Sequence, residues 1–379
     1  MDLSYYLILF FLIFYVSSLI PIPLSKSIVV ANQNPLNGIR GVLASLVMFS
    51  HLFKDIHINQ GNEWKHNGDY FEIISFGNQA TNTGKIGVAI FFMISGFLFY
   101  RLLEKDSLNI KKFNIGRIKR IAPLYFSVVL FCTIYIAINY ISSYSYLTNT
   151  IEFIKWLLFF GQYDVLPIAN MTKGVEWTLK LEILLYISIP ILFFFFKRLD
   201  SNLAKHIIII TSIIFIFFIG FLLRKFGKVY IDPRAVLCFY VGYVAIELNN
   251  KEKIKNILQS DAVALASIIL FISAFFISSY NLFYLYIIFS CGFIFMAIAS
   301  GNALFGILNH RNLQFLGEIS YSIYLIHGVV LFFFMQLLKK MEIYNAFFIV
   351  VLSIVYFYTV FFFASITFKY IESKFHKKS

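Results

Sequence analysis

The chain has 379 residues, of which 60% are hydrophobic, 20% are aromatic and only 13% are charged. A soluble globular domain cannot bury that much apolar surface, whereas a protein with several membrane-spanning helices exposes it to lipid. The formal net charge is +13, which in a soluble protein would suggest nucleic acid binding. Because membrane proteins collect Lys and Arg in their cytoplasmic loops, this charge indicates topology instead, and we expect no nucleic acid partner.

Apolar stretches long enough to cross a bilayer as helices recur from one end of the chain to the other. Their ranges are 3–24, 39–53, 85–101, 121–141, 177–196, 206–223, 233–248, 261–279, 282–300, 317–338 and 344–368. The sequence therefore predicts an all-α polytopic membrane protein with about eleven transmembrane helices. The stretches 39–53 and 233–248 are short for a span of about 20 residues. A further apolar stretch, 153–168, is short and interrupted, so we expect it to be interfacial or re-entrant.

Two features of the chain bear on its topology. Residues 1–24 have the length of a signal peptide, but they begin with an acidic residue and lack a basic segment, so we expect an uncleaved first helix. If the segment after Arg101 faces the cytoplasm, 19 of the 32 Lys and Arg residues lie on that side and 11 on the other. This bias favours a cytoplasmic C-terminus, and eleven spans then place the N-terminus outside.

The three cysteines lie within apolar stretches. Cys132, Cys238 and Cys291 show no Cys-x-x-Cys spacing. They are typical of small buried side chains rather than of disulfides or metal ligands. We therefore expect no metal site.

Arg40 and His51, in the stretch NGIRGVLASLVMFSH, are the first polar pair inside a predicted span. Ionisable groups inside a membrane are costly, so each is a functional candidate. The two residues share one face of a helix at a separation of about 16 Å. A neutral His51 could act as a general base or accept an acyl group. The alternative is an interfacial histidine near water, which the helix alone slightly favours.

Seven Lys and Arg residues lie between positions 101 and 120. Arg117 and Arg120, with Lys119 between them, are spaced i, i+3 directly before Pro123 and share a helical face. Two guanidinium groups suit a diphosphate-like ligand, because each binds phosphate oxygens through two hydrogen bonds. The alternative is a basic loop that anchors the chain to anionic lipid headgroups.

Two later stretches also place polar residues in predicted spans. In GVEWTLKLEILLY, Glu182 and Tyr186 are spaced i, i+4, and we expect a histidine or arginine partner for the Glu182 carboxylate. The alternative for Glu182 is a structural ion pair between helices. The alternative for Trp177 is a position in the aromatic belt at the membrane surface. In LGEISYSIYLIHG, a polar stripe follows one helical face and consists of Ser320, Tyr324 and His327. Such a stripe joins helices through hydrogen bonds or lines a cavity, and we expect both, with a catalytic role for the histidine less favoured.

Taken together, the stretches GIRGVLASLVMFSH, GKIGVAIFFMISGFLF, RIKRIAPLY, EWTLKLEILLY, LGEISYSIYLIH and FKYIE resemble the acyltransferase-3 family of integral membrane O-acyltransferases. That family includes bacterial polysaccharide O-acetyltransferases. The resemblance implies a ten-helix core within an acyltransferase membrane domain at 37–372. Residues 1–36 would add one N-terminal transmembrane helix and a linker, and residues 373–379 would form a basic cytoplasmic tail. The chain departs from the family's usual start, since Asn37 stands where an Asp is common.

The resemblance also implies a reaction and a location. An acyl group, most commonly acetyl in this family, would move from cytoplasmic acyl-CoA (acetyl-CoA) to a hydroxyl of a cell-surface glycan, such as O-antigen, or of a lipid-linked saccharide. The enzyme would be a multi-pass protein of the bacterial inner (plasma) membrane, without a permanently bound cofactor. Because the chain ends without the esterase-like domain of some members, we expect a separate extracytoplasmic transferase partner.

The family motifs assign roles to residues of this chain. They imply catalytic roles for His51, Arg40 and Glu182 and an acyl-CoA site at Arg117 and Arg120, helped by Lys119. The residues expected to line the substrate cavity are Trp177, Tyr186, Ser320, Tyr324 and His327.

Two other functions fit the same composition. A transporter or flippase of lipid-linked sugars or other anionic substrates would also have many helices and a basic inner face. Carriers often show internal repeats, and the sequence has none. A polysaccharide polymerase or glycosyltransferase would be favoured by a large outer loop, but the loop 54–84 is short.

Overall fold

A computed structural model of the chain describes residues 3–30, 33–59, 76–140, 146–159, 161, 168–226, 232–276, 283–341 and 346–376. Within these residues all regular structure is helical. Of the predictions above, residues 60–75 of the loop 54–84, residues 160 and 162–167 of the stretch 153–168, and the last three residues of the tail lie outside the described residues.

Every apolar stretch that the sequence predicts as a span contains a helix. The corresponding helices are α1 (Leu3–Leu19), α2 (Pro35–Asn59), α3 (Phe76–Tyr100), α4 (Ile110–Tyr140), α7 (Trp177–Phe196), α8 (Asn202–Phe226), α9 (Leu237–Asn249), α11 (Asp261–Ser273), α12 (Phe283–Ala299), α14 (Ser320–Met341) and α15 (Ala346–Thr367). Shorter helices connect them, namely α5 (Tyr146–Leu157), α6 (Ile168–Thr172), α10 (Glu252–Leu258), α13 (Arg311–Glu318) and α16 (Ser373–His376).

In the described part of the chain, seven helices are long and apolar enough to cross a membrane, or eight if α10 and α11, bent by 63°, form one span. Helices α1, α9 and α12 are apolar but shorter there. Only 22% of the apolar window of α8 is buried inside the protein, as expected of a helix that faces lipid. The chain is an all-α polytopic membrane protein, as predicted, while the number of eleven spans stays a prediction.

Helix α2 is longer than the predicted stretch 39–53. It begins at Pro35, where the side-chain oxygen of Asn34 accepts a hydrogen bond from the backbone N–H of Asn37 at 2.8 Å. This is an N-terminal cap, and proline suits the first helical position because its missing N–H would have no partner there. At its other end α2 continues to Asn59 through polar residues such as Lys54, which an apolar pattern does not mark as helical.

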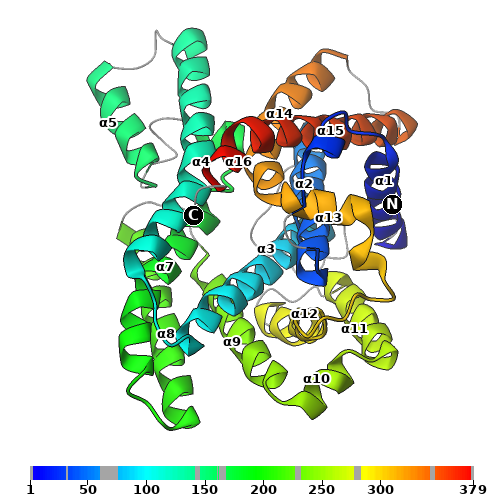
Figure 1. Cartoon of the computed structure of the whole chain (residues 1–379). Coiled ribbons are helices and arrows are strands. Elements are labelled where there is room, and N and C mark those ends of the chain that lie inside the picture. Colours follow the sequence, from blue (N-terminus) through cyan, green and yellow to red (C-terminus); the bar gives the residue numbers. More distant parts are fainter. Residues whose placement is uncertain are drawn as a thin grey trace.

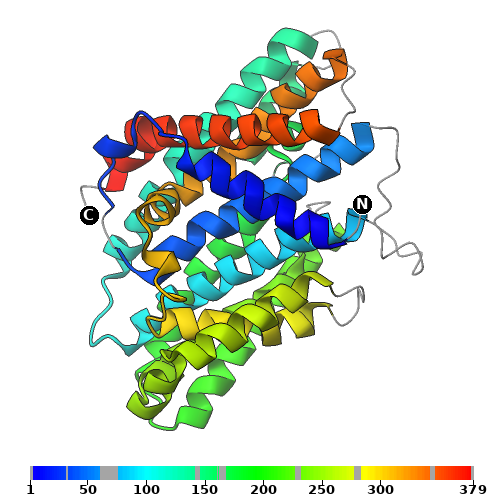
Figure 2. The same ribbon diagram turned by 90° about the vertical axis from the view of Figure 1, so that its right-hand side faces the viewer.

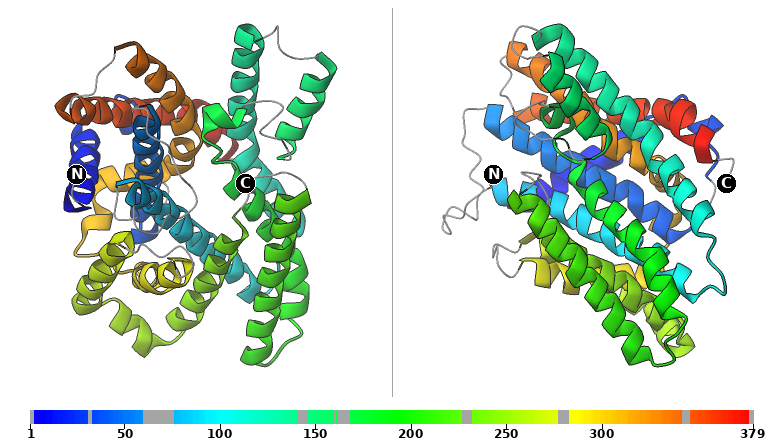
Figure 3. Two further views of the ribbon diagram at one scale, coloured as in Figure 1. Left: turned by 180° about the vertical axis from the view of Figure 1, so that it is seen from behind. Right: turned by 90° about the vertical axis from the view of Figure 1, so that its left-hand side faces the viewer.

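Helices α2 and α3 form the centre of the bundle. Helix α2 packs against α3, α13 and α14, and α3 packs against α9. Figure 1 shows α1 and α8 on opposite flanks of this centre, and Figure 3 shows the same arrangement from behind. In Figure 2 the N- and C-termini lie at opposite ends of the bundle, and the chain leaves α3 at the C-terminal end. Termini at opposite ends are what an odd number of crossings requires.

Gly96 of α3 and Gly242 of α9 let these two helices approach closely. A Cβ atom at Gly96 would lie 2.3 Å from the carbonyl oxygen of Phe239, and one at Gly242 would lie 2.3 Å from the backbone nitrogen of Phe97. Small residues serve this purpose between membrane helices, where close backbone packing replaces the hydrophobic effect.

We expect Gly96→Ala to separate α3 from α9 and to destabilise the protein by about 1–3 kcal/mol, the usual cost of overpacking. The measurement is the melting temperature of the purified protein in detergent. Gly116→Ala is the matched control, because no atom lies within 4 Å of a Cβ at that position and alanine favours a helix. A Gly96→Ala protein that melts no lower than the control would contradict the expectation.

Candidate active site

A cavity lies among α2, α3, α4, α7 and α14, and we call it the site cavity. Its volume is about 90 Å³, which is room for a few water molecules or a small acyl group. Its polar lining residues are Arg40, Ser95, Arg120, Thr178, Glu182, Tyr186, Ser320, Tyr321 and Tyr324. The structure thus gathers in one cavity six of the residues that the sequence proposes for the site, from four separate helices.

Arg40 and Arg120 supply the positive charge of the site cavity. Within the described residues neither guanidinium forms a hydrogen bond or an ion pair at contact distance. Among the carboxylates that interact electrostatically with Arg40, Glu372 and Glu318 have the largest effects. Two guanidinium groups that face one cavity without contact partners suit an anionic ligand, because each offers a planar fork of donors.

Glu182 is held at the wall of the site cavity by two hydroxyl groups. The hydroxyl of Tyr186, one turn along α7, donates a hydrogen bond to Oε1 of Glu182. Ser95 of α3 donates to the same oxygen at 3.3 Å. The sequence leads us to expect a histidine or arginine partner for this carboxylate. Arg40 and Arg117 interact with Glu182 electrostatically, but within the described residues neither forms an ion pair with it at contact distance. The carboxylate is therefore oriented by hydroxyl groups rather than by an arginine.

Arg117 and Arg120 share a helical face but differ in their surroundings. The guanidinium carbon of Arg117 lies 5.2 Å from the centre of the Phe99 ring and 6.0 Å from that of Tyr186, positions that favour cation–π attraction. Neither Arg117 nor Lys119 lines the site cavity. Of the three residues predicted to bind acyl-CoA, only Arg120 lines the site cavity.

His51 and His327 lie side by side, three turns along α2 from the cavity arginine of that helix. Their ring centres are 5.3 Å apart. His327 is fully buried, and its Nδ1 lies 2.8 Å from the carbonyl oxygen of Tyr324. Because a carbonyl only accepts, Nδ1 carries the proton, and in a neutral imidazole Nε2 is then an acceptor. No described residue forms a hydrogen bond with that Nε2, so His327 offers an unpaired acceptor next to His51.

The ring of Tyr324 lies between the site cavity and the histidine pair. Tyr324 lines the cavity, and its ring centre lies 6.1 Å from that of His327. The hydroxyl of Tyr324 lies 3.0 Å from the hydroxyl of Thr178 and donates to the carbonyl of Val175 at 3.2 Å. A path of contacts thus leads from the cavity through Tyr324 and His327 to His51, although His51 is not itself among the lining residues.

Gly328 explains why the neighbouring His327 is so deeply buried. A Cβ at Gly328 would lie 2.4 Å from the backbone of Thr172, so only glycine admits the end of α6 onto α14 at this point. The next residue, Lys173, forms an ion pair with Asp55 of α2 at 2.6 Å. This ion pair joins the turn after α6 to α2, one helical turn past the predicted catalytic histidine.

The remaining predicted lining residues differ in position. Ser320 lines the site cavity, and its Oγ has no hydrogen-bond partner among the described residues. Trp177, at the start of α7, does not line the cavity; its ring packs against Phe92, 6.1 Å away.

No group of three His, Cys, Asp or Glu side chains that could hold a metal ion occurs in the described part of the chain.

Sequence reasoning missed Glu372, which lies on a π-helical turn after α15, Phe368–Glu372. The carboxylate is buried, accepts a hydrogen bond from Ser322 at 2.8 Å, and interacts electrostatically with Arg120 and Arg40. π-Helical turns are frequent at functional sites. The available signal was a carboxylate inside the stretch FKYIE, but nothing local relates it to arginines of α2 and α4.

Ser95 and Tyr321 also lie on the wall of the site cavity; the sequence does not indicate Ser95, whereas Tyr321 belongs to the stretch LGEISYSIYLIH that carries the family resemblance. Tyr321 donates a hydrogen bond to the carbonyl of Ile121 at 2.8 Å and so joins α14 to α4. Both are common residues of apolar helices, and no spacing signal distinguishes them.

Comparison with known proteins shows to which family the chain is related. A family model described as an acyltransferase domain, that of the acyltransferase-3 family, matches residues 34–371. The O-acetyltransferase OatA of Staphylococcus aureus strain NCTC 8325 is 24% identical over 337 residues, which cover 78% of this chain and 53% of that protein; OatA of strain COL gives the same values. Another Staphylococcus aureus protein, from strain COL, bears the name "Putative O-acetyltransferase SACOL0978". It is 24% identical over 340 residues, which cover 78% of this chain and 53% of that protein.

The chain spans about half the length of these relatives, and no solved structure gave a significant match. The matched range 34–371 contains all the residues of the site cavity. Because the family model covers most of the sequence, the chain belongs to the acyltransferase-3 family.

Proposed function

We propose that the chain is a membrane O-acyltransferase that moves an acyl group from cytoplasmic acyl-CoA to a hydroxyl of a cell-surface glycan or a lipid-linked sugar. Membership of the family supports the reaction class, and the names of the relatives favour acetyl as the acyl group. One observation carries the proposal: Arg40 and Arg120 face one cavity without a contact ion pair, and that cavity leads by contacts to a pair of histidines.

The donor would bind at the end of the bundle where α3 and the C-terminus end. Under the predicted orientation this end carries 19 of the 32 Lys and Arg residues, a bias that supports its assignment to the cytoplasmic face of a bacterial inner membrane. Coenzyme A carries a pyrophosphate and a ribose phosphate. Arg120 and Arg40 would bind the pyrophosphate, Arg117 would hold the aromatic wall beside them, and Lys119 would add positive potential. The acyl end of the pantetheine arm would then reach the site cavity beside Tyr324.

His51 would act as the general base. It takes the proton of the acceptor hydroxyl as the hydroxyl oxygen bonds to the thioester carbonyl carbon. The tetrahedral intermediate then collapses, its C–S bond breaks, and the leaving coenzyme A thiolate takes the proton from the imidazolium. His327, through its unpaired Nε2, would accept the N–H of His51 and so orient it. Holding thioester and hydroxyl together supplies much of the rate.

The acceptor would approach from the opposite end, past Asp55 and Lys173. Their ion pair leaves both side chains less than a fifth exposed, so it forms part of the wall there. An extracytoplasmic transferase could pass the acyl group on from the first acceptor.

Transfer of label from acetyl-CoA tests this function directly. The purified chain in lipid nanodiscs is given radiolabelled acetyl-CoA and a lipid extract that contains lipid-linked saccharides, and the label in the lipid and glycan fractions is counted. We expect label to leave coenzyme A and enter these fractions. Label that stays in coenzyme A, together with movement of lipid-linked sugar across vesicles, would overturn the proposal in favour of a flippase.

We expect His327→Gln to lower kcat by about 10- to 100-fold without changing KM for acetyl-CoA, because the residue orients the base rather than binding the donor. Steady-state kinetics of coenzyme A release measure both constants. Tyr356→Phe is the control: it removes a hydrogen bond to the backbone carbonyl of His327 at 3.2 Å and leaves the imidazole in place. Equal losses in the two variants would show that packing alone matters.

A further inference from the structure

A second cavity, which we call the basal cavity, lies at the end of the bundle where α3 ends. It is bounded by the 3-10 helix after α3 (Arg101–Glu104), the end of α7, the start of α8 and the end of α9. It shares no lining residue with the site cavity. Its volume is about 590 Å³, within the range of small-molecule sites. No sequence motif indicates this cavity.

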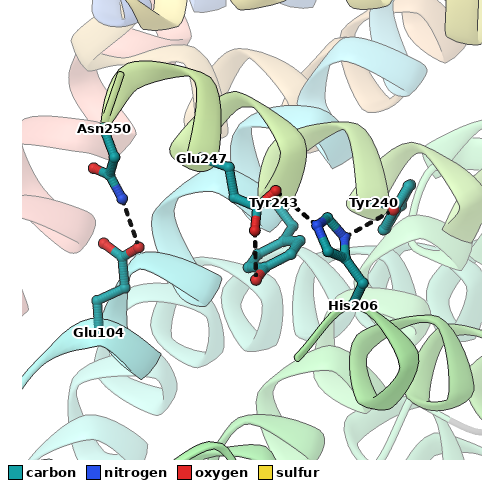
Figure 4. Close-up of polar contacts among 6 residues, drawn as sticks. All are labelled: Glu104, His206, Tyr240, Tyr243, Glu247 and Asn250. Carbon is teal, nitrogen blue, oxygen red and sulfur yellow. Dashed lines mark hydrogen bonds and ion pairs between the residues drawn. The ribbon is translucent and has the colours of Figure 1, made fainter. Parts of the chain in front are cut away.

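The wall of the basal cavity is a network of hydrogen bonds between helices (Figure 4). His206 of α8 pairs with Glu247 of α9 through Nε2 at 2.7 Å, and its Nδ1 lies 2.9 Å from the hydroxyl of Tyr240. Tyr243 donates to the other oxygen of Glu247 at 3.2 Å. Both oxygens of the Glu247 carboxylate therefore already have partners within the wall.

The second carboxylate of the wall is also occupied. Glu104, after α3, accepts a hydrogen bond from Asn250, at the end of α9, at 3.0 Å, as Figure 4 shows. A third acidic residue, Asp106, approaches Lys197 only at 4.0 Å with a fully exposed side chain. Exposed ion pairs at such distances contribute little.

Lysines bring an excess of positive charge to the lining of the basal cavity. Lys205 and Lys251 line it, and neither side-chain ammonium forms a hydrogen bond or an ion pair within the described residues. Lys205 is half-buried, and its ammonium lies 5.1 Å from the centre of the Phe196 ring. Lys197 contributes a third ammonium. The three ammonium groups outnumber the two carboxylates that line the cavity, Glu104 and Glu247, and this excess favours a compact anion such as a phosphate monoester.

The two cavities lie along the same helices. Phe99, at the end of α3, lines the site cavity, and Leu103, on the 3-10 helix Arg101–Glu104 that follows α3, lines the basal cavity. On α7 the corresponding residues are Tyr186 and Phe196, about 15 Å apart. A ligand with two separate anionic groups can therefore place one in each cavity.

We propose that the basal cavity is a phosphate-binding site that takes the ribose 3′-phosphate of the acyl donor, while the arginines of the site cavity bind its pyrophosphate. This inference rests on the proposed function, since it assumes a coenzyme A thioester as donor. A phosphate could also come from the headgroup of an anionic lipid, so the test separates the two sources.

The experiment measures binding of coenzyme A and of 3′-dephospho-coenzyme A by calorimetry, with the full chain in neutral-lipid nanodiscs. We expect the wild type to bind coenzyme A about tenfold more tightly than the dephospho form. The double variant Lys205→Gln/Lys251→Gln should bind both equally, at the affinity of the wild type for the dephospho form. Lys253→Gln/Lys255→Gln is the matched control, because both lysines are exposed on α10 and line neither cavity; it should keep the tenfold preference.

A double variant that keeps the preference, or a wild type without one, would overturn the inference. So would a wild-type preference that disappears once anionic phospholipid is added to the nanodiscs, because the site would then be occupied by a lipid headgroup. Label transfer is measured on the same samples. Transfer without a lysine-dependent preference refutes this inference alone, whereas the preference without any transfer refutes the proposed reaction and leaves the phosphate site.

Discussion

His51→Gln is expected to lower acyl transfer by about 10³-fold while the protein still folds into the membrane. The imidazole is the proposed base, and loss of a general base typically costs 10²- to 10⁴-fold. Glutamine keeps a polar group of similar length next to His327 but cannot take a proton at neutral pH. The measurement is label transfer from radiolabelled acetyl-CoA, together with the melting temperature and the yield of purified protein.

His310→Gln is the matched histidine control. His310 is exposed at the start of α13, where its ring accepts a hydrogen bond from the backbone of Asn312 at 3.4 Å, and it lines neither cavity. We expect its rate within twofold of the wild type. A His51→Gln protein that transfers label at more than a tenth of the wild-type rate would exclude His51 as the base.

Arg120→Gln is expected to raise KM for acetyl-CoA by about 100-fold with a smaller change in kcat. A charge-assisted pair with a phosphate is lost, and removing one partner of such a pair costs about 2–5 kcal/mol. Arg117→Gln should raise KM by less, because that guanidinium stacks on Phe99 instead of facing the site cavity. Steady-state kinetics over a range of acetyl-CoA concentrations distinguish the two variants.

Lys111→Gln removes one charge from the exposed start of α4 and controls for the general positive potential of this face. We expect a KM change below threefold for this control. Because Arg40 and Arg120 share one ligand, the effects of Arg40→Gln and Arg120→Gln should not add in the double variant. Equal KM values for Arg120→Gln and Lys111→Gln would remove the specific role of Arg120.

Several features of the site follow from spacing along single helices. Glu182 and Tyr186, predicted to share a face at i, i+4, are hydrogen-bonded to each other. Ser320 and Tyr324, predicted as one polar stripe, both line the site cavity. A helix repeats every 3.6 residues whatever surrounds it, so relations within one helix can be predicted without knowing the neighbours.

Relations between helices were less predictable. The sequence groups Arg117 with Arg120, but only Arg120 faces the site cavity. It also gives no indication that His327 lies against His51 or that His206 of α8 pairs with Glu247 of α9.

The sequence by itself determined the class of the protein, an all-α polytopic membrane protein of the acyltransferase-3 family, together with the order of its helices and the polar residues within them. The tertiary structure decided which of those residues meet, adding Glu372 to the surroundings of Arg40 and Arg120 and revealing the basal cavity. The physical reason is that lipid and a neighbouring helix are both apolar. A helical face that contacts lipid and one that contacts protein therefore have similar sequences, and only packing shows which polar side chain faces which partner.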